Sequence, residues 1–268
     1  MSALLITVII FLALFIGWLK HQEKYAAFAP AREMSGDPSV HGMSYEDVHF
    51  TSGDGTGLDG WFIPGTSHVT LLWLHGNAGN ISDRLGILRG FNRSLSVSSF
   101  IFDYRGYGVS GGRPSERGLY EDAQAAWKWL TENRGVSPGD IILYGHSLGT
   151  AVAVDLALGA GRSAAGLVLE SPFTSVRALA RRIYGGVPVD LFMSLRFDNI
   201  NRVGKVKMPL LVIHGERDAT IPFSMGQDVF AAGSEPKRFL PVPRADHSDC
   251  YLVGGEVYWD AWRELLRP

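Results

Sequence analysis

Apolar residues along the chain gather in short runs that alternate with segments of helical spacing. Short continuous apolar runs predict strands, and they lie at residues 69–74, 99–102, 141–144, 167–170, 210–214 and 238–242. Helical patterns lie between or after these runs, at residues 115–133, 150–158 and 256–266. Strands that are apolar throughout are buried on both faces. The alternation therefore predicts an α/β fold with a mostly parallel central sheet and helices on both of its faces.

Two apolar stretches near the start of this pattern predict a β-hairpin. They cover residues 45–50 and 58–63, and the Gly-rich sequence TSGDGTG lies between them. Residues 21–44 precede the hairpin and mix charged residues with Pro and Gly in little periodicity, which is typical of a stalk or linker. We therefore expect a stalk over 21–44 and an α/β domain over 45–268.

Residues 3–19 differ from the rest of the chain, because they read ALLITVIIFLALFIGWL and contain no charged side chain. As a helix this run would span about 26 Å at ~1.5 Å per residue, which is within the range for crossing a membrane. Trp18 and Lys20 at its end suit the membrane interface and the headgroups. We therefore expect residues 1–20 to form a single-pass transmembrane anchor.

Two other interpretations of this segment stay open. A cleaved signal peptide would begin with a positively charged region, and no charged side chain precedes residue 3. A buried core helix would carry polar residues on an outer face, which this run lacks. Lys20, Lys24 and Arg32 follow the segment, so the positive-inside tendency favours a catalytic domain on the cytoplasmic side.

Composition and charge exclude several classes of function. Lys and Arg number 25 against 27 Asp and Glu, and the formal net charge of -2 gives no case for a nucleic-acid partner. The single cysteine, Cys250, excludes an intrachain disulfide and a cysteine-pair metal site. The sequence contains no H-E-x-x-H and no G-x-G-x-x-G that opens a βαβ unit, so we expect no metal and no cofactor. The oligomeric state stays open.

The sequence GHSLG at residues 145–149 matches the nucleophile-elbow pattern G-x-S-x-G, with Ser147 at its centre. In such an elbow the serine lies on a strained turn between a strand and a helix, and the flanking glycines remove side chains that would clash. The pentapeptide alone is a weak signal in a chain with 32 glycines. The predicted strand before it and the predicted helix after it make Ser147 the candidate nucleophile rather than a residue that only caps a helix.

An elbow serine needs a base and an acid that orients the base. Asp218 follows the predicted strand 210–214, and His247 follows the predicted strand 238–242. Both residues therefore belong to the carboxyl edge of the sheet, where open α/β sheets hold their sites and where the elbow also lies. We expect Asp218 to be the acid and His247 the base. The alternatives are that Asp218 is only a turn residue and that His247 is only a surface-loop histidine.

The sequence HGNAGN at residues 75–80 follows a strand at the same edge and is the candidate oxyanion loop. A backbone N–H group of this loop could stabilise the charge that develops on a substrate carbonyl oxygen. We assign this donor to Asn77, with Ala78 as the near alternative. The second donor is the N–H of Leu148 at the start of the predicted helix, where the helix dipole also helps. The alternative is that HGNAGN forms a simple Gly-Asn turn without a catalytic role.

Six sequence segments together resemble one known family. They are LLWLHGNAGN (71–80), FDYRGYGVSGG (102–112), YGHSLGTAVA (144–153), ESPFTS (170–175), FDN (197–199) and PLLVIHGERDATIPF (209–223). In this order they resemble the membrane-anchored branch of the α/β-hydrolase-domain proteins, which includes protein depalmitoylases, lysophospholipase-like enzymes and many uncharacterised bacterial hydrolases. The resemblance covers about residues 45–268.

The resemblance implies an α/β-hydrolase fold and places the nucleophile at Ser147, the acid at Asp218 and the base at His247. One departure is Asp246, which stands where the family usually has a glycine before the histidine. This fold usually inserts a cap at the position of residues 171–208, and this stretch is too short for a large lid. Its apolar residues either line an acyl groove or only pack onto the sheet: Phe173, Ile183, Tyr184, Val187, Leu191, Phe192, Met193, Leu195 and Phe197.

The sequence thus predicts a serine hydrolase that cleaves carboxylic ester or thioester bonds. We expect its substrates to be small or lipid-like acyl compounds that are reached at a membrane surface. Two alternatives remain. One is an aminopeptidase-like amidase with the same catalytic groups, and the other is a non-catalytic, membrane-bound α/β-hydrolase scaffold.

Overall fold

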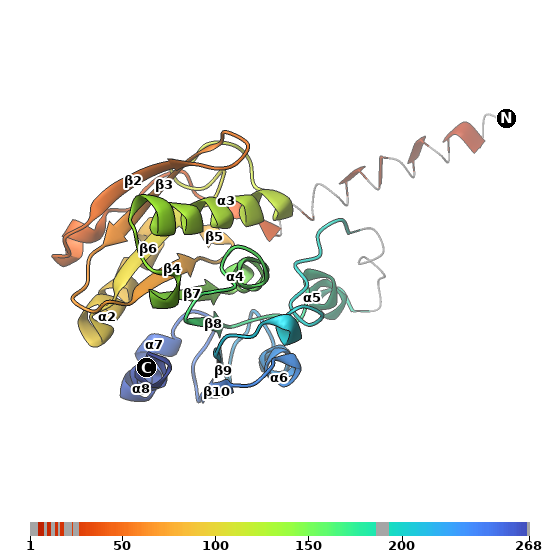
Figure 1. The fold of residues 1–268 in the computed structure, drawn as a ribbon. Helices are drawn as coiled ribbons and strands as arrows, with labels where there is room; N and C mark the ends of the chain where they lie inside the picture. Colours follow the sequence, from red (N-terminus) through yellow and green to blue (C-terminus); the bar gives the residue numbers. More distant parts are fainter. Residues whose placement is uncertain are drawn as a thin grey trace.

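A twisted sheet forms the centre of the computed structural model (Figure 1). The structure describes residues 27–185 and 193–266 throughout and, before residue 27, only residues 5–7, 10–11, 14–15, 17–18 and 23. Within these residues eight strands make up the sheet, in the order β10-β9-β8-β7-β4-β6-β3-β2. The predicted hairpin is confirmed as β2 (Glu46–Thr51) and β3 (Gly57–Ile63), which pair antiparallel.

The rest of the sheet is parallel, apart from the antiparallel pairing of β3 with β6. Its strands are β4 (Thr70–Leu74), β6 (Ser98–Asp103), β7 (Ile141–His146), β8 (Gly166–Glu170), β9 (Leu210–Gly215) and β10 (Lys237–Val242). Every residue of β4, β7, β8 and β9 is buried, as expected for strands covered on both faces. The prediction of a mostly parallel α/β sheet is therefore confirmed.

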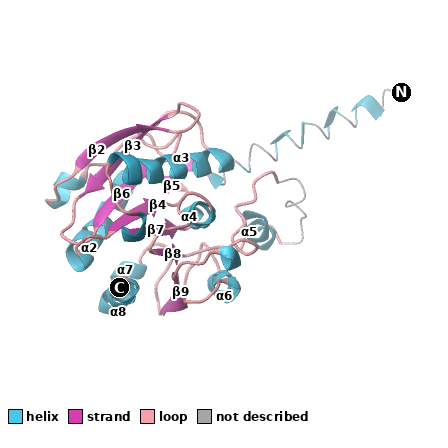
Figure 2. Cartoon of the chain, in the orientation of Figure 1, coloured by secondary structure: helices cyan, strands magenta, loops and turns pink. Residues whose placement is uncertain are grey.

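Helices cover both faces of the sheet, as Figure 2 shows. One face packs against α2 (Leu85–Leu95), α7 (Cys250–Val253) and α8 (Gly255–Leu265), and Trp73, Phe91 and Trp262 lie in the core between them. The other face packs against α3 (Glu116–Lys128), α4 (Leu148–Leu158) and α6 (Phe223–Ala232). α3 begins after an N-cap at Ser115, whose side chain accepts a hydrogen bond from the Gly118 N–H.

Residues 171–208 contain one described α-helix, α5 (Val176–Ile183), and a short 3₁₀ turn, Val203–Lys205. Three of the apolar residues noted in this stretch are buried in the core: Phe173, Leu195 and Phe197. Ile183 and Tyr184, at the end of α5, are 65% and 53% exposed. Val187, Leu191 and Phe192 lie outside the described residues.

Residues 27–44 lie on the surface of the domain, which differs from the separate stalk predicted for 21–44. β1 (Ala29–Pro30) pairs in parallel with β5 (Ala78–Gly79), and a 3₁₀ turn follows at Pro38–His41. Phe28 is 5% exposed and belongs to the core. No periodic pattern marks a two-residue strand, so the sequence could not reveal this attachment.

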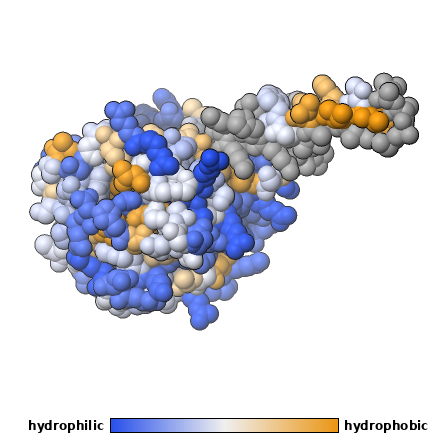
Figure 3. Space-filling model, turned by 90° about the horizontal axis from the view of Figure 1, so that it is seen from above, coloured by the Kyte–Doolittle hydropathy of each residue, from blue (hydrophilic) through white to orange (hydrophobic). Residues whose placement is uncertain are grey.

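The predicted anchor over residues 1–20 falls partly outside the described residues. Among the residues that the structure describes, no helix is long and apolar enough to cross a membrane, so the predicted transmembrane helix is not found. Its described apolar side chains are exposed: Leu5, Ile6, Ile10, Phe11, Leu14, Phe15 and Trp18. Figure 3 shows orange, hydrophobic atoms along the extension that leaves the domain.

Candidate active site

Ser147 lies on the turn between β7 and α4, with backbone angles φ 53° and ψ -118°. A positive φ is strained for a residue with a side chain, so the surrounding structure must hold this turn in place. The flanking positions must be glycine, because a side chain at either one would clash with the backbone. A Cβ atom on Gly145 would lie 2.5 Å from the Gly149 carbonyl oxygen, and one on Gly149 would lie 1.9 Å from the carbonyl oxygen of Leu74. The sequence G-x-S-x-G thus forms the expected elbow.

The structure brings the candidate nucleophile, base and acid into one hydrogen-bonded chain. His247 Nε2 lies 2.9 Å from Ser147 Oγ, and His247 Nδ1 lies 2.8 Å from Asp218 Oδ2. Because the Asp218 carboxylate can only accept, the Nδ1–H group donates to it, and the Nε2 lone pair is left for the Ser147 hydroxyl. This arrangement can accept the serine proton and stabilise the charged imidazole that results.

Asp218 keeps its negative charge although its side chain is buried. Burial alone would raise the pKa of Asp218, but hydrogen bonds from His214, His247 and the Ile221 N–H hold that pKa well below its usual value. Its Oδ1 atom accepts from the N–H groups of Thr220 and Ile221, at 2.9 and 2.7 Å. The loop after β9 therefore supplies an ionised, oriented carboxylate.

His214, the residue before the last glycine of β9, also belongs to this site and was not predicted as a site residue from the sequence. Its Nε2 atom lies 3.2 Å from Asp218 Oδ2 and 3.0 Å from the carbonyl oxygen of Ile221, and its ring is fully buried. The same carboxylate oxygen thus contacts both His214 and His247. The spacing of four residues between His214 and Asp218, across the end of a strand, was the sequence feature from which this contact could have been predicted.

Asp246 joins the acid loop to the base loop. Its Oδ1 atom accepts from the N–H groups of Ala219 and His247, at 2.9 and 2.7 Å. The departure from the family's usual glycine therefore places a carboxylate that ties the two loops together. Asp198, a carboxylate in the stretch between β8 and β9, accepts hydrogen bonds from Asn201.

Two further side chains hold the backbone of the candidate base. His146 Nε2–H donates to the His247 carbonyl oxygen at 3.1 Å, and Ser171 Oγ donates to the same oxygen at 3.2 Å. Burial lowers the pKa of His146 to about 3, so its imidazole is neutral and acts as a donor without adding a charge. These contacts come from the last residue of β7 and from the residue after β8, and only the folded sheet brings them next to His247.

The candidate oxyanion loop lies against the nucleophile. A Cβ atom on Gly76 would lie 3.4 Å from Ser147 Cβ. His75 Nδ1–H donates to the Gly76 carbonyl oxygen at 2.8 Å, and C=O and N–H point in opposite directions in a trans peptide, so this bond also orients the Asn77 N–H. Leu148 is the first residue of α4, where N–H groups lack an intrahelical acceptor. Asn77 and Leu148 stay predicted donors.

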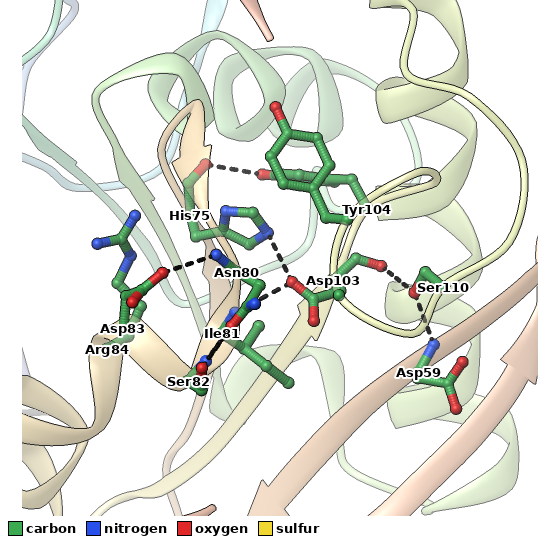
Figure 4. Close-up of polar contacts among 12 residues, drawn as sticks. Asp59, His75, Asn80, Ile81, Ser82, Asp83, Arg84, Asp103, Tyr104 and Ser110 are labelled. Carbon is green, nitrogen blue, oxygen red and sulfur yellow. Dashed lines mark hydrogen bonds and ion pairs between the residues drawn. The ribbon is translucent and has the colours of Figure 1, made fainter. Parts of the chain in front are cut away.

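A buried polar cluster lies behind this loop (Figure 4). His75 Nε2 lies 3.7 Å from Asp103 Oδ1, and this oxygen accepts a hydrogen bond from the Ile81 N–H at 3.0 Å. Burial lowers the pKa of His75 to about 3 and raises that of Asp103 to about 7. Tyr104 donates to the carbonyl oxygen of His75 at 3.3 Å. The cluster therefore holds the start of the loop from inside the domain with a neutral histidine.

Among the described residues, no group of three or more His, Cys, Asp or Glu side chains is arranged to hold a metal ion. The prediction of no metal and no cofactor remains a prediction.

Comparisons with known proteins place the chain among α/β-hydrolases, since the alpha/beta hydrolase domain-containing protein WAV2 of Arabidopsis thaliana is 33% identical over 248 residues, or 85% and 80% of the two chains. Residues 67–199 match the family model described as serine aminopeptidase, S33. An uncharacterised protein of Mycobacterium tuberculosis is 41% identical over 223 residues, which cover 82% of this chain and 78% of that protein. Protein bem46 of Schizosaccharomyces pombe is 33% identical over 264 residues, or 94% and 88% of the two chains. The solved structure of a Pyrococcus furiosus esterase superposes with a TM-score of 0.73 at 23% identity, over 90% and 97% of the two chains.

Proposed function

The chain belongs to the α/β-hydrolase superfamily, and we propose that it is a serine hydrolase that cleaves carboxylic ester or thioester bonds. The observation that carries this proposal is the hydrogen-bonded chain from Ser147 through His247 to Asp218 at the carboxyl edge of the sheet. Family membership alone would allow a silent scaffold. A strained serine within 2.9 Å of an oriented imidazole favours catalysis.

The first half of the proposed reaction forms an acyl-enzyme. Ser147 Oγ attacks the substrate carbonyl carbon while its proton passes to His247 Nε2, and the ionised Asp218 stabilises the imidazolium. The N–H groups of Asn77 and Leu148 would bind the negative oxygen of the tetrahedral intermediate. When the intermediate collapses, the bond to the leaving group breaks, and His247 returns its proton to the departing alcohol or thiol.

The second half regenerates the enzyme. A water molecule gives a proton to His247 and attacks the acyl carbon, and collapse of the second intermediate releases the carboxylic acid and restores the Ser147 hydroxyl. Only the residues of this site and water take part, so the reaction needs no cofactor.

We propose that the acyl group is lipid-like. Of the apolar residues between β8 and β9, Ile183 and Tyr184 are exposed and leave an apolar surface at the end of α5. Phe173, Leu195 and Phe197 are buried, which fits the plainer role of packing the cap onto the sheet. The substrate proposal therefore rests on the exposed end of α5.

An aminopeptidase-like amidase is the second candidate, because residues 67–199 match a family described as serine aminopeptidase. The same triad can attack an amide carbonyl, whose amine leaving group must be protonated by His247. The two candidates are separated by assaying p-nitrophenyl esters against aminoacyl p-nitroanilides under identical conditions. Higher catalytic efficiency on the anilides would favour the amidase.

Replacement of the nucleophile tests the proposed function. Ser147→Ala should abolish hydrolysis of p-nitrophenyl esters and labelling by a fluorophosphonate probe, while the far-UV circular dichroism stays that of the wild type. The reason is that the variant lacks the hydroxyl that would form the acyl-enzyme. Activity of the variant within tenfold of the wild type would show that Ser147 is not the nucleophile. A wild-type protein that the probe does not label would favour the scaffold.

We further propose that residues 1–20 attach the domain to a membrane and that the domain lies on the cytoplasmic side. Support comes from the apolar run, from the exposure of its described side chains and from the basic residues that follow it.

A further inference from the structure

The segment between the N-terminal apolar run and the hairpin contacts the candidate oxyanion loop directly. We call residues 27–35 the strap. Ala29 N–H donates to the Asn77 carbonyl oxygen, and Ala31 N–H donates to the Gly79 carbonyl oxygen, both at 3.0 Å. These are the hydrogen bonds of the parallel pair β1 and β5. The strap therefore adds a short edge strand to the loop that carries the predicted oxyanion donor.

A side chain of the loop strengthens this attachment. Asn80 Nδ2 donates to the carbonyl oxygens of Ala31 and Glu33, at 3.3 and 2.7 Å, and Asn80 is 1% exposed. Its Oδ1 atom accepts from the N–H and the hydroxyl of Ser82, a contact drawn in Figure 4. Ser82 Oγ in turn accepts from the Ser35 N–H at 2.9 Å. Both ends of the loop segment 77–82 are thus bonded to the strap.

The strap is also fixed to its other neighbours. Arg32 donates through Nη1 to the carbonyl oxygens of Gly108 and Ser110, and Gly108 N–H donates to the Ala31 carbonyl oxygen at 2.9 Å. Tyr107, in the same turn, donates to the Asn77 carbonyl oxygen at 2.8 Å. The strap, the turn at residues 107–110 and the oxyanion loop therefore form one hydrogen-bonded unit.

Towards the N-terminus the same chain contacts the cap. The carboxylate of Glu23, which is 8% exposed, accepts from the Ser194 N–H, the Ser194 hydroxyl and the Leu195 N–H, at 3.0, 2.8 and 2.7 Å. Phe28 packs edge-on against Phe197, with ring centroids 6.1 Å apart. Glu23 and Phe28 thus contact the end of the cap, and the strap contacts the oxyanion loop.

We propose that the strap positions the oxyanion loop for catalysis, so that turnover at Ser147 depends on the segment that follows residues 1–20. This inference rests on the proposed function. The Asn77 carbonyl, held by Ala29, belongs to the residue whose N–H is the predicted oxyanion donor. A small displacement of a positioned donor is enough to lower a rate strongly. The strap residues touch no substrate and act only through the loop.

Two substitutions at Ala29 that introduce side chains of similar size test the strap. Ala29→Pro removes the N–H that bonds to Asn77, whereas the matched control Ala29→Val keeps it, and the side chain at this position is exposed. Active sites are titrated to completion with a fluorophosphonate, and kcat per titrated site and KM are measured on a soluble p-nitrophenyl ester. We expect kcat of Ala29→Pro to fall roughly tenfold to a hundredfold with KM within about twofold, and Ala29→Val to match the wild type.

A second readout separates positioning from stability. The affinity of a trifluoromethyl ketone, whose adduct with Ser147 places an oxyanion in the same loop, should fall by the same factor as kcat. A purely structural strap would lower the melting temperature and the titrated fraction of active sites. It would leave kcat per titrated site and the affinity for the ketone unchanged. That result would overturn the proposal.

Arg32 supplies a milder pair of variants if Ala29→Pro does not fold. Arg32→Ala removes the bonds to Gly108 and Ser110 at an exposed position, and Arg32→Lys keeps a donor there. We expect kcat per site to fall for Arg32→Ala and to recover towards the wild type for Arg32→Lys. Equal kcat in all three proteins would overturn the proposal. A wild-type protein that the fluorophosphonate does not label would reject the proposed function, and the positioning role with it.

Discussion

At the scale of single residues, the candidate site depends on which groups surround each catalytic side chain. Ser147, Asp218 and His247 could be placed from the sequence because each follows a predicted apolar strand at the same edge of the sheet. His214, His146 and Ser171 could not be assigned their contacts, because those contacts form only when β7, β8, β9 and the His247 loop pack together. Sequence position thus indicates the candidate reacting groups better than the groups that hold them.

The identity of the acid is testable by one amide substitution. Asp218→Asn should lower turnover roughly 10⁴-fold, because an amide cannot accept from His247 Nδ1–H in the same way and favours the wrong tautomer. The matched control is Asp198→Asn, since Asp198 contacts Asn201 and not the base. Asp246→Asn should have an intermediate effect through the two loops that Asp246 joins. If either control is more damaging than Asp218→Asn, the acid is assigned wrongly. The measurement is kcat on p-nitrophenyl esters.

Glu170 provides a prediction about stability and pH. Its side chain is 1% exposed, it accepts from the hydroxyls of Tyr144 and Tyr258, and burial raises its pKa to about 6 from the ordinary 4.5. The folded state therefore binds the Glu170 proton more tightly than the unfolded state. The resulting stabilisation is fully present below pH 4.5 and is lost as the pH rises through 6.

Glu170→Gln should remove this dependence, because the amide does not titrate. Between about pH 4.5 and 7, the wild type should lose up to roughly 2 kcal/mol of unfolding free energy relative to the variant, at about 1.4 kcal/mol for each unit of pKa difference. Urea unfolding of both proteins at several pH values measures this difference. A difference that stays constant with pH would mean that Glu170 does not titrate abnormally.

At the scale of elements, the strands were easier to predict than the helices. The strands of the sheet were found at their approximate positions because continuous apolar runs mark them. The helices α2 and α6 were missed, and both contain a glycine at a close contact. A Cβ atom on Gly90 would lie 2.7 Å from the Trp259 ring, and one on Gly226 would lie 2.2 Å from His214 Nδ1. Glycine lowers helix propensity, so tertiary packing decides these helices.

The cap carries the prediction about substrate size. If the exposed apolar end of α5 contributes to an acyl groove, catalytic efficiency should rise with acyl length from two carbons to about eight, because each buried methylene contributes roughly 0.8 kcal/mol. A series of p-nitrophenyl esters on detergent-solubilised enzyme measures this rise. Ile183→Ser and Tyr184→Ser should flatten it, and Val40→Ser, at a similarly exposed apolar residue in the 3₁₀ turn Pro38–His41, is the control. A series that peaks at acetate would leave a small-ester hydrolase.

At the scale of the whole molecule, the sequence predicted the layered α/β arrangement but not how the N-terminal region joins it. Composition and hydropathy suggested an anchor, a stalk and a domain in series. The structure instead shows residues 27–44 on the domain, with Phe28 in the core and Glu23 bonded to the cap. Attachment through backbone hydrogen bonds leaves no hydrophobic pattern, since any residue except proline can donate them.

This attachment gives the membrane proposal a consequence that can be measured. If residues 1–20 hold the protein in a bilayer, the domain should lie close to the membrane surface. The reason is that Glu23 and Phe28, shortly after this segment, contact Leu195 and Phe197 of the domain. The full-length protein should then stay in the membrane pellet at alkaline carbonate pH, and a protein lacking residues 1–20 should be released. Protease added to intact spheroplasts should leave the domain uncleaved if it lies on the cytoplasmic side. Release of the full-length protein by carbonate would refute the anchor, and cleavage in intact spheroplasts would reverse its orientation.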